Sequence, residues 1–336
     1  MKTKALHAHA LLILGLIGLS TQSISTAIPK NVKILAPEIY KANKDTTYQI
    51  QKTYAREDNQ YTQGFVYIKD GNKILQSTGE YGKSQINYLQ LDEVKETATV
   101  TKLRKLRSND FGEGCDIIYN NIYQLTWESR KIFVYNKELK PLATVPLPLG
   151  IAEGWGLTHS EKTTQTDSGE KFTTTTAYVT DGSNILFHCK VDPVSHKFTI
   201  VKKVPVFVVT RHGHKQSLDS LNELQFIDGY VWSNVYLSNH IARINPLTGE
   251  AILFDMSALR AIANRETRKR FKRDLDYEEC LNGIALLRRE NGVLELLLTG
   301  KDWPVIFQVR MTGKQMLASA GGLNSAGQRV EGLMTE

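Results

Sequence analysis

The sequence predicts an all-β protein assembled from a repeated four-stranded sheet. Alternating or β-branched runs end repeatedly at Asp-Gly pairs, a pattern typical of strands and hairpins. These runs cover residues 64–68 before Asp70-Gly71, 178–180 before Asp181-Gly182, and 224–227 before Asp228-Gly229. Helical periodicity is nearly absent except over residues 256–277, where a few apolar residues precede a basic run. That range predicts one helix and loop within a β protein.

A short signature of polar residues and glycine recurs along the chain and is expected to open a strand each time. Its copies begin about 40 to 70 residues apart, a spacing that fits one four-stranded unit per repeat. The copies are Gln63-Gly64, Glu113-Gly114, Glu153-Gly154, Asn222-Glu223 and Asn282-Gly283. Five such units in a circle make a five-bladed β-propeller, an arrangement that protects sheet edges. The short helix is then an insertion in the fourth repeat.

Equivalent positions of a propeller converge in space. The innermost strands start near the central channel, so Gln63, Glu113, Glu153, Asn222 and Asn282 are expected around one of its mouths. The alternative is that these side chains hydrogen-bond the exposed strand ends. We expect that structural role for Glu153 and Asn282.

The N-terminal residues predict a secretory route. Lys2 and Lys4 precede an apolar run at 10–19 and small or polar residues at 20–27, the layout of a signal peptide. We therefore assign 1–27 to a signal peptide, with an uncleaved signal anchor as the alternative. An approach segment (28–47), the propeller domain (48–318) and a C-terminal tail (319–336) follow. No later segment is apolar enough to cross a membrane, so no stable membrane insertion is expected after signal removal. We expect the mature protein to be secreted and monomeric.

Charge and cysteine content exclude several function classes. The formal net charge is +7 and is spread along the chain, with one dense basic stretch at Arg265–Arg273. We interpret that stretch as a solvated helix or loop, not as a nucleic-acid surface. Cys115, Cys189 and Cys280 form no CxxC pair, which excludes zinc-ribbon and thioredoxin-like sites and leaves one disulfide plus a free thiol open.

Ten motifs spread over residues 61–304 resemble, in their order, the plant and bacterial type of glutamine cyclotransferase, the glutaminyl cyclases. They are 61–65 (YTQGF), 77–84 (STGEYGKS), 111–114 (FGEG), 123–127 (YQLTW), 153–158 (EGWGLT), 180–183 (TDGS), 221–224 (LNEL), 231–235 (VWSNV), 281–285 (LNGIA) and 298–304 (LTGKDWP). Each motif alone is weakly specific, and the ordered set is strongly specific. The resemblance implies a five-bladed propeller that converts N-terminal glutamine of peptides and proteins to pyroglutamate and releases ammonia.

The resemblance also implies a site. Glu113 matches the family's proton shuttle, and a carboxylate suits the transfer of a proton from an α-amine to departing ammonia. Lys301 and Asn222 are the expected donors to the developing oxyanion. The expected substrate-binding residues are Gln63, Tyr61, Phe111, Trp127, Trp155 and Tyr236.

The aromatic positions include two departures from the family. Tyr236 and Tyr61 stand where the family commonly has Trp and Phe, which affects the expected rate and substrate range. Trp232 and Trp303 are instead expected in the core. The alternative for the other aromatic residues is also ordinary core packing.

Metal chemistry is not expected. The His residues are scattered, and His212 and His214 come closest to a ligand pair but lack a nearby carboxylate pattern. We expect no cofactor, while a structural calcium or zinc ion stays open.

Two other functions remain as alternatives. One is a catalytically weak or inactive propeller that only binds partners, since fold does not fix function. The other is a calcium-dependent lactonase or hydrolase in which Glu113, Asn222 and Asn282 are ligands. The joint presence of Glu113, Asn222 and Lys301 disfavours the first, and the Trp-rich surroundings disfavour the second.

Overall fold

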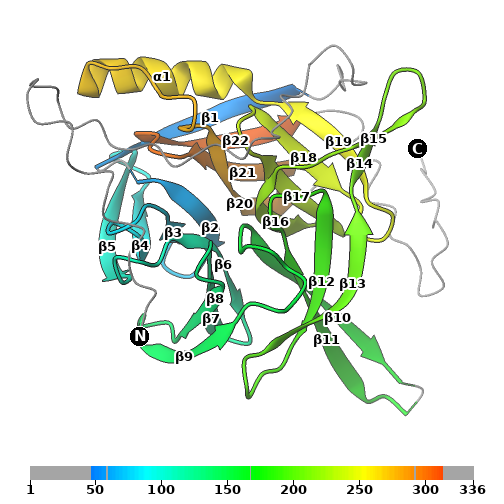
Figure 1. The fold of residues 1–336 in the computed structure, drawn as a ribbon. Coiled ribbons are helices and arrows are strands. Elements are labelled where there is room, and N and C mark those ends of the chain that lie inside the picture. Colours follow the sequence, from blue (N-terminus) through cyan, green and yellow to red (C-terminus); the bar gives the residue numbers. More distant parts are fainter. Residues whose placement is uncertain (1–46, 58–59, 167, 291–292, 313–336) are drawn as a thin grey trace, which may run out of the picture. The chain divides into compact units, whose positions relative to one another are not determined.

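The computed structural model describes residues 47–57, 60–166, 168–290 and 293–312, and within these ranges the chain forms 22 strands and one helix. The predicted all-β class is confirmed (Figure 1). The signal peptide, nearly all of the approach segment and the C-terminal tail lie outside the described residues. Among the residues described, no helix combines the length and apolarity that a membrane span needs.

Strands pair antiparallel in sequence-consecutive groups of four. The first group is β2 (Thr62–Ile68), β3 (Lys73–Thr78), β4 (Gln85–Asp92) and β5 (Thr97–Lys105). The second is β6 (Gly112–Ile118), β7 (Asn121–Thr126), β8 (Lys131–Tyr135) and β9 (Pro141–Pro146). The third is β10 (Leu157–Gln165), β11 (Lys171–Val179), β12 (Ile185–Val191) and β13 (Phe198–Pro205). The fourth is β16 (Leu221–Ile227), β17 (Tyr230–Val235), β18 (His240–Ile244) and β19 (Glu250–Asp255), extended by the hairpin β14 (Phe207–Val209) and β15 (Lys215–Ser217).

The last group combines strands from both ends of the described chain. It contains β20 (Leu281–Glu290), β21 (Val293–Gly300), β22 (Val305–Thr312) and β1 (Thr47–Arg56). β1 pairs antiparallel with β22, and its last two residues also pair parallel with Thr97 and Ala98 of β5. The N-terminal strand therefore completes the C-terminal sheet.

The first strands of the groups contact one another in a closed circuit, from β2 to β6, β10, β16, β20 and back to β2. Hydrogen bonds join them at their starts. The backbone N–H of Gly114 donates to the Trp155 carbonyl at 2.7 Å, and the N–H of Ile284 donates to Glu223 Oε2 at 2.8 Å. The starts of these strands therefore form one connected region.

Four of these strands are irregular where the sequence signature lies. The register shifts between Thr62 and Gly64, Gly112 and Cys115, Leu221 and Leu224, and Leu281 and Ile284. A bulge leaves its extra residues out of the ladder and redirects their side chains. The bulged residues include Gln63, Glu113, Asn222 and Asn282, so the irregularity frees these polar side chains from regular sheet positions.

The third copy of the signature was assigned to the wrong residues. β10 begins at Leu157, so Glu153-Gly154 does not open a strand. The glycine that approaches β16, the next first strand, is Gly156. An added Cβ there would lie 2.0 Å from the backbone oxygen of Asn222. Backbone approach, which the letters alone do not reveal, decides which glycine is equivalent.

Gly156→Ala is expected to lower the free energy of unfolding by about 3 kcal/mol, because backbone atoms cannot move aside as a flexible side chain can. Urea denaturation of the purified variant measures this loss. The control is Gly229→Ala, where a Cβ meets nothing within 4 Å and only a left-handed backbone (φ +82°) is penalised, by about 1 kcal/mol. Equal losses in the two variants would contradict the steric explanation.

Helix α1 (Ser257–Phe271) lies between β19 and β20, within the range that the sequence singled out. It lies along β1 and β22 in Figure 1, and its buried Leu259 and Ala263 pack in one cluster with Val309 and Met311 of β22. Trp232 and Trp303 belong to the same cluster, which confirms their predicted place in the core.

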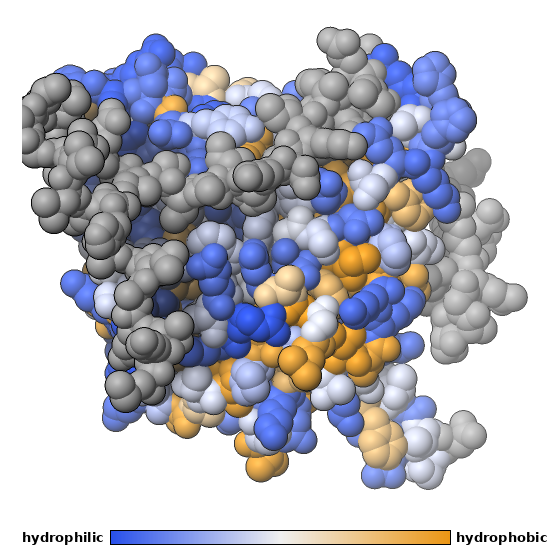
Figure 2. Space-filling model, viewed as in Figure 1, coloured by the Kyte–Doolittle hydropathy of each residue, from blue (hydrophilic) through white to orange (hydrophobic). Residues whose placement is uncertain are grey.

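The surface mixes polar and apolar side chains. Figure 2 shows apolar atoms gathering over the region of β12 and β13, where Val201 is 62% exposed. Cys115, Cys189 and Cys280 are all buried and unpaired, so the disulfide that the sequence left open does not form.

Candidate active site

Glu113 is the central carboxylate of the candidate site. It lies in the bulge of β6 with 4% of its surface exposed, and Gln63 Nε2 donates to its Oε1 at 3.0 Å. Asn282 Nδ2 in turn donates to Gln63 Oε1 at 2.9 Å and to the Thr62 carbonyl at 2.8 Å. This chain fixes the Gln63 amide with its nitrogen toward Glu113. The second carboxylate oxygen, Oε2, has no partner among the described residues.

Burial controls the protonation of the site. It raises the pKa of Glu113 well above the usual range of a glutamate, while the Lys301 charge opposes the shift and the Glu153 charge adds to it. Burial also lowers the pKa of Lys301, against the attraction of carboxylates that include Glu113 and Glu278. A raised pKa makes a carboxylate a stronger base, which suits a group that accepts a proton and later returns it.

Lys301 lies between two phenol rings. Its Nζ is 4.6 Å from the ring centre of Tyr61 and 4.5 Å from that of Tyr236, and the residue is 2% exposed. It follows the end of β21 and forms a backbone bridge with Tyr61. Ring faces attract a cation, so the two tyrosines hold the ammonium in place.

The predicted aromatic residues join Lys301 in a closed series of contacts. Ring centres are 6.1 Å apart for Tyr61 and Phe111, 5.6 Å for Phe111 and Trp127, and 5.5 Å for Trp155 and Tyr236. Glu153 Oε2 links the two tryptophans, accepting from Nε1 of Trp127 at 2.6 Å and of Trp155 at 2.9 Å. We call this closed series of seven residues the site ring. It runs through Tyr61, Phe111, Trp127, Glu153, Trp155, Tyr236 and Lys301 and returns to Tyr61.

Asn222 occupies the equivalent bulge of β16 and is 2% exposed. Its backbone oxygen accepts from the Thr180 hydroxyl at 2.9 Å, while its side-chain Oδ1 has no partner among the described residues. No hydrogen bond within the described ranges joins its side chain to Glu113 or Lys301. The structure therefore directly connects Gln63 with Glu113, and Lys301 with the two tyrosines, but not Asn222 with either group.

These site residues lie inside the span matched by a known family. The sequence model described as glutamine cyclotransferase matches residues 19–311. The chain belongs to the glutamine cyclotransferase family. The resemblance inferred from the ordered motifs is thereby confirmed.

Individual relatives agree with this membership. The chain is 30% identical over 275 residues to the glutaminyl-peptide cyclotransferase of Arabidopsis thaliana, covering 81% of this chain and 73% of that protein. It is also similar to the crystal structure of Myxococcus xanthus glutaminyl cyclase, with a TM-score of 0.59 and 25% identity over 80% of this chain and 97% of the other.

The sequence reasoning did not anticipate the contacts of three residues near this candidate site. Glu153 was expected at the channel mouth with a structural role at a strand end, and it bonds two indoles instead. Tyr81 packs 5.4 Å from Phe111 and 6.4 Å from Trp127, with its hydroxyl donating to Glu128 Oε2 at 2.9 Å. Tyr81 lies in a quoted motif, but nothing in its spacing marks it as a neighbour of Phe111.

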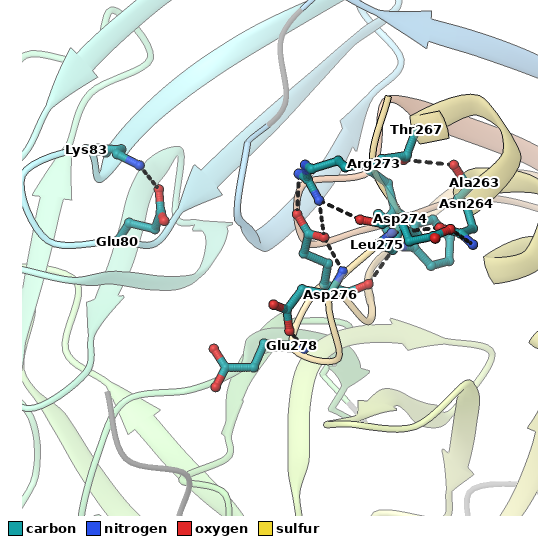
Figure 3. Close-up of polar contacts among 12 residues, drawn as sticks. Glu80, Lys83, Ala263, Asn264, Thr267, Arg273, Asp274, Leu275, Asp276 and Glu278 are labelled. Carbon is teal, nitrogen blue, oxygen red and sulfur yellow. Dashed lines mark hydrogen bonds and ion pairs between the residues drawn. The ribbon is translucent and has the colours of Figure 1, made fainter. Parts of the chain in front are cut away.

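Glu278 is the third, and it lies in the loop between α1 and β20. Burial raises the pKa of its carboxyl, the Asp276 charge adds to this shift, and the Lys301 charge opposes it. Figure 3 shows its carboxylate directed away from the neighbouring contacts of Arg273 and Asp274. The loop itself is held by Arg273, which donates to both carboxylate oxygens of Glu279 at 2.6 Å, and by the Leu275 N–H, which donates to Asn264 Oδ1 at 2.6 Å.

The basic stretch Arg265–Arg273 contributes to this same framework. Arg270 donates to the backbone oxygens of Arg56 and Glu57, and Arg268 pairs with Asp274. Several of the basic side chains therefore tie the helix to β1 and to the loop that leads into β20.

Proposed function

We propose that this protein is a glutaminyl-peptide cyclotransferase that converts N-terminal glutamine to pyroglutamate with release of ammonia. The observation that carries this proposal is Glu113, a buried carboxyl held by Gln63 through one oxygen, whose other oxygen has no partner within the described part of the chain. Family membership and the Arabidopsis thaliana relative support the reaction class. The substrates are peptides and proteins that begin with glutamine.

The proposed reaction moves protons through Glu113. The carboxylate takes one proton from the substrate's α-ammonium, and the freed amine attacks the carbon of its own side-chain amide. A C–N bond forms and the carbonyl becomes an oxyanion. Glu113 then protonates the amide nitrogen, the old C–N bond breaks, and ammonia leaves as the carbonyl reforms. The new ring nitrogen gives its extra proton to Glu113, which passes it to the released ammonia, so the carboxylate is regenerated and the net products are pyroglutamate and ammonium.

Lys301 and Asn222 are proposed to stabilise the oxyanion. The Lys301 ammonium is fixed by two phenol rings in a buried site, where a charge acts more strongly than it does in water. The Asn222 side chain is buried and has hydrogen-bonding capacity left unused by the described residues. The aromatic side chains of the site ring would pack against the glutamine methylenes and exclude water. Tyr61 and Tyr236 place hydroxyls where the family commonly has Phe and Trp.

We also propose that the sheets form a five-bladed β-propeller, with α1 inserted after the fourth blade. The closed circuit of first strands and the completion of the last sheet by β1 support this architecture. The catalytic domain would span 48–318, and the protein would act as a monomer in the secretory pathway without a metal ion.

Incubating the purified protein with a short peptide that begins with glutamine should release ammonia and lower the peptide mass by one ammonia. The rate should persist after dialysis against a chelator, because no step of the proposed reaction uses a metal. An absence of turnover above the uncatalysed rate over several peptides would favour the binding-module alternative. Loss of turnover with the chelator and its return with calcium would favour the metal-dependent hydrolase class.

A further inference from the structure

One carboxylate oxygen bridges two tryptophans from different four-stranded groups. Trp127 directly follows β7, and Trp155 precedes β10. Both indole N–H groups donate to Oε2 of Glu153, at 2.6 and 2.9 Å. An indole has a single donor, and here each donor is committed to the same charged acceptor.

This bridge fixes the orientation of both rings. A hydrogen bond to a charged acceptor is roughly twice as strong as a neutral one, and it restricts rotation of the indole that donates it. The Trp155 ring also packs closely on Gly182, where an added Cβ would lie 2.7 Å from it, so only a glycine leaves room for the ring in this orientation. Glu153 is also the one member of the site ring that connects its neighbours by hydrogen bonds alone.

We propose that Glu153 is a positioning residue of the site: it holds Trp127 and Trp155 in the orientation that receives the glutamine side chain. The inference rests on the proposed cyclotransferase activity. Holding the two indoles does not require Glu153 to touch the substrate.

The Glu153 charge also acts on Glu113, and its effect can be separated from other influences. Burial has the largest effect and raises the pKa of Glu113, the Lys301 charge lowers it, and the Glu153 charge raises it further. Tyr61, Tyr81 and Tyr236 also lie within electrostatic reach of Glu113, and burial raises the pKa of each, so they stay neutral near pH 7. Glu153 is therefore the carboxylate whose charge opposes ionisation of Glu113.

Two substitutions in the full-length protein separate the two effects. Glu153→Gln keeps an oxygen acceptor for the indoles and removes the charge. The acid limb of the kcat/KM profile should then move to lower pH, with a modest fall in its plateau. Glu153→Ala also removes the acceptor, so we expect kcat/KM to fall by about 100-fold through misplacement of the rings. Glu128→Gln is the matched control: it removes a carboxylate adjacent to Trp127 in sequence, but that carboxylate bonds Tyr81. Its acid limb should not move.

Tryptophan fluorescence supplies a readout that does not depend on turnover. Trp232 and Trp303 are 1% and 0% exposed, so quenching by acrylamide reports mainly on Trp127 and Trp155. Quenching should increase in Glu153→Ala and change less in Glu153→Gln. Urea unfolding of each variant checks that the fold is retained.

The outcomes distinguish this inference from the proposed function. If the wild type turns over and Glu153→Ala matches it in kcat/KM and in quenching, the positioning role is overturned. An unmoved acid limb in Glu153→Gln overturns the charge effect. If the wild type has no activity on glutamine peptides, the proposed function fails, while the quenching data still decide whether Glu153 holds the two indoles.

Discussion

Glu113→Gln is expected to reduce kcat for glutamine cyclisation by about 10³-fold, because an amide cannot carry a proton between the two nitrogens. The replacement keeps the size of the side chain and an oxygen that can accept from Gln63, so binding geometry is preserved. KM should therefore change far less than kcat. Steady-state ammonia release with a glutamine-initiated peptide measures both constants.

The control for this variant is Glu223→Gln. Glu223 is also a buried carboxyl with a raised pKa, but it accepts from the Ile284 N–H at the start of β20 and is not a member of the site ring. Its kcat should stay within about tenfold of the wild type, the scale of an effect without a direct role in proton transfer. Equal losses in both variants would mean that any buried carboxyl here supports activity through the fold alone.

The Glu113→Gln substitution also has a predictable effect on the free energy of unfolding. Because the pKa of Glu113 is raised in the folded state, its contribution to stability is present below its ordinary value of 4.5 and is lost as pH rises through the folded pKa. Glutamine cannot ionise, so Glu113→Gln should gain stability relative to the wild type as pH rises from 4 to 8. Urea unfolding at several pH values tests the sign.

Lys301→Met is expected to lower kcat/KM by about 10² to 10³-fold, the usual loss when one donor to a developing oxyanion is removed. Methionine keeps a long apolar stem between Tyr61 and Tyr236. Loss of the ammonium also removes the attraction that lowers the pKa of Glu113, so the acid limb of the pH profile should move to higher pH. This shift is opposite in sign to the one expected for Glu153→Gln.

Stability and a matched cation complete the test of Lys301. Burial lowers the pKa of Lys301, so an apolar replacement should leave the fold as stable as the wild type or more so. Lys83→Met removes an exposed ammonium that pairs with Glu80 at 2.9 Å, and its kinetics should match the wild type. A Lys301→Met enzyme with wild-type kcat/KM would refute the assignment of Lys301 to the oxyanion.

Much of the fold and part of the site follow from sequence alone. Alternating runs bounded by Asp-Gly predicted strands, because burial on one face has a period of two and tight turns need particular residues. The recurring signature brought Gln63 and Glu113 together, and their side chains do bond. The ordered motifs identified the family before any geometry was known.

Other features were decided only by the contacts between sheets. The letters of Glu153-Gly154 match the signature, yet Gly156 makes the close backbone approach to β16 and Glu153 bonds two indoles. Tyr236 and Lys301 are far apart in the chain, and nothing in either segment indicates that they touch. Local sequence patterns record the burial and turn chemistry of each segment. The choice of acceptor for an indole or of ring for an ammonium depends on which groups packing brings within a few ångströms, and that is a property of the assembled sheets.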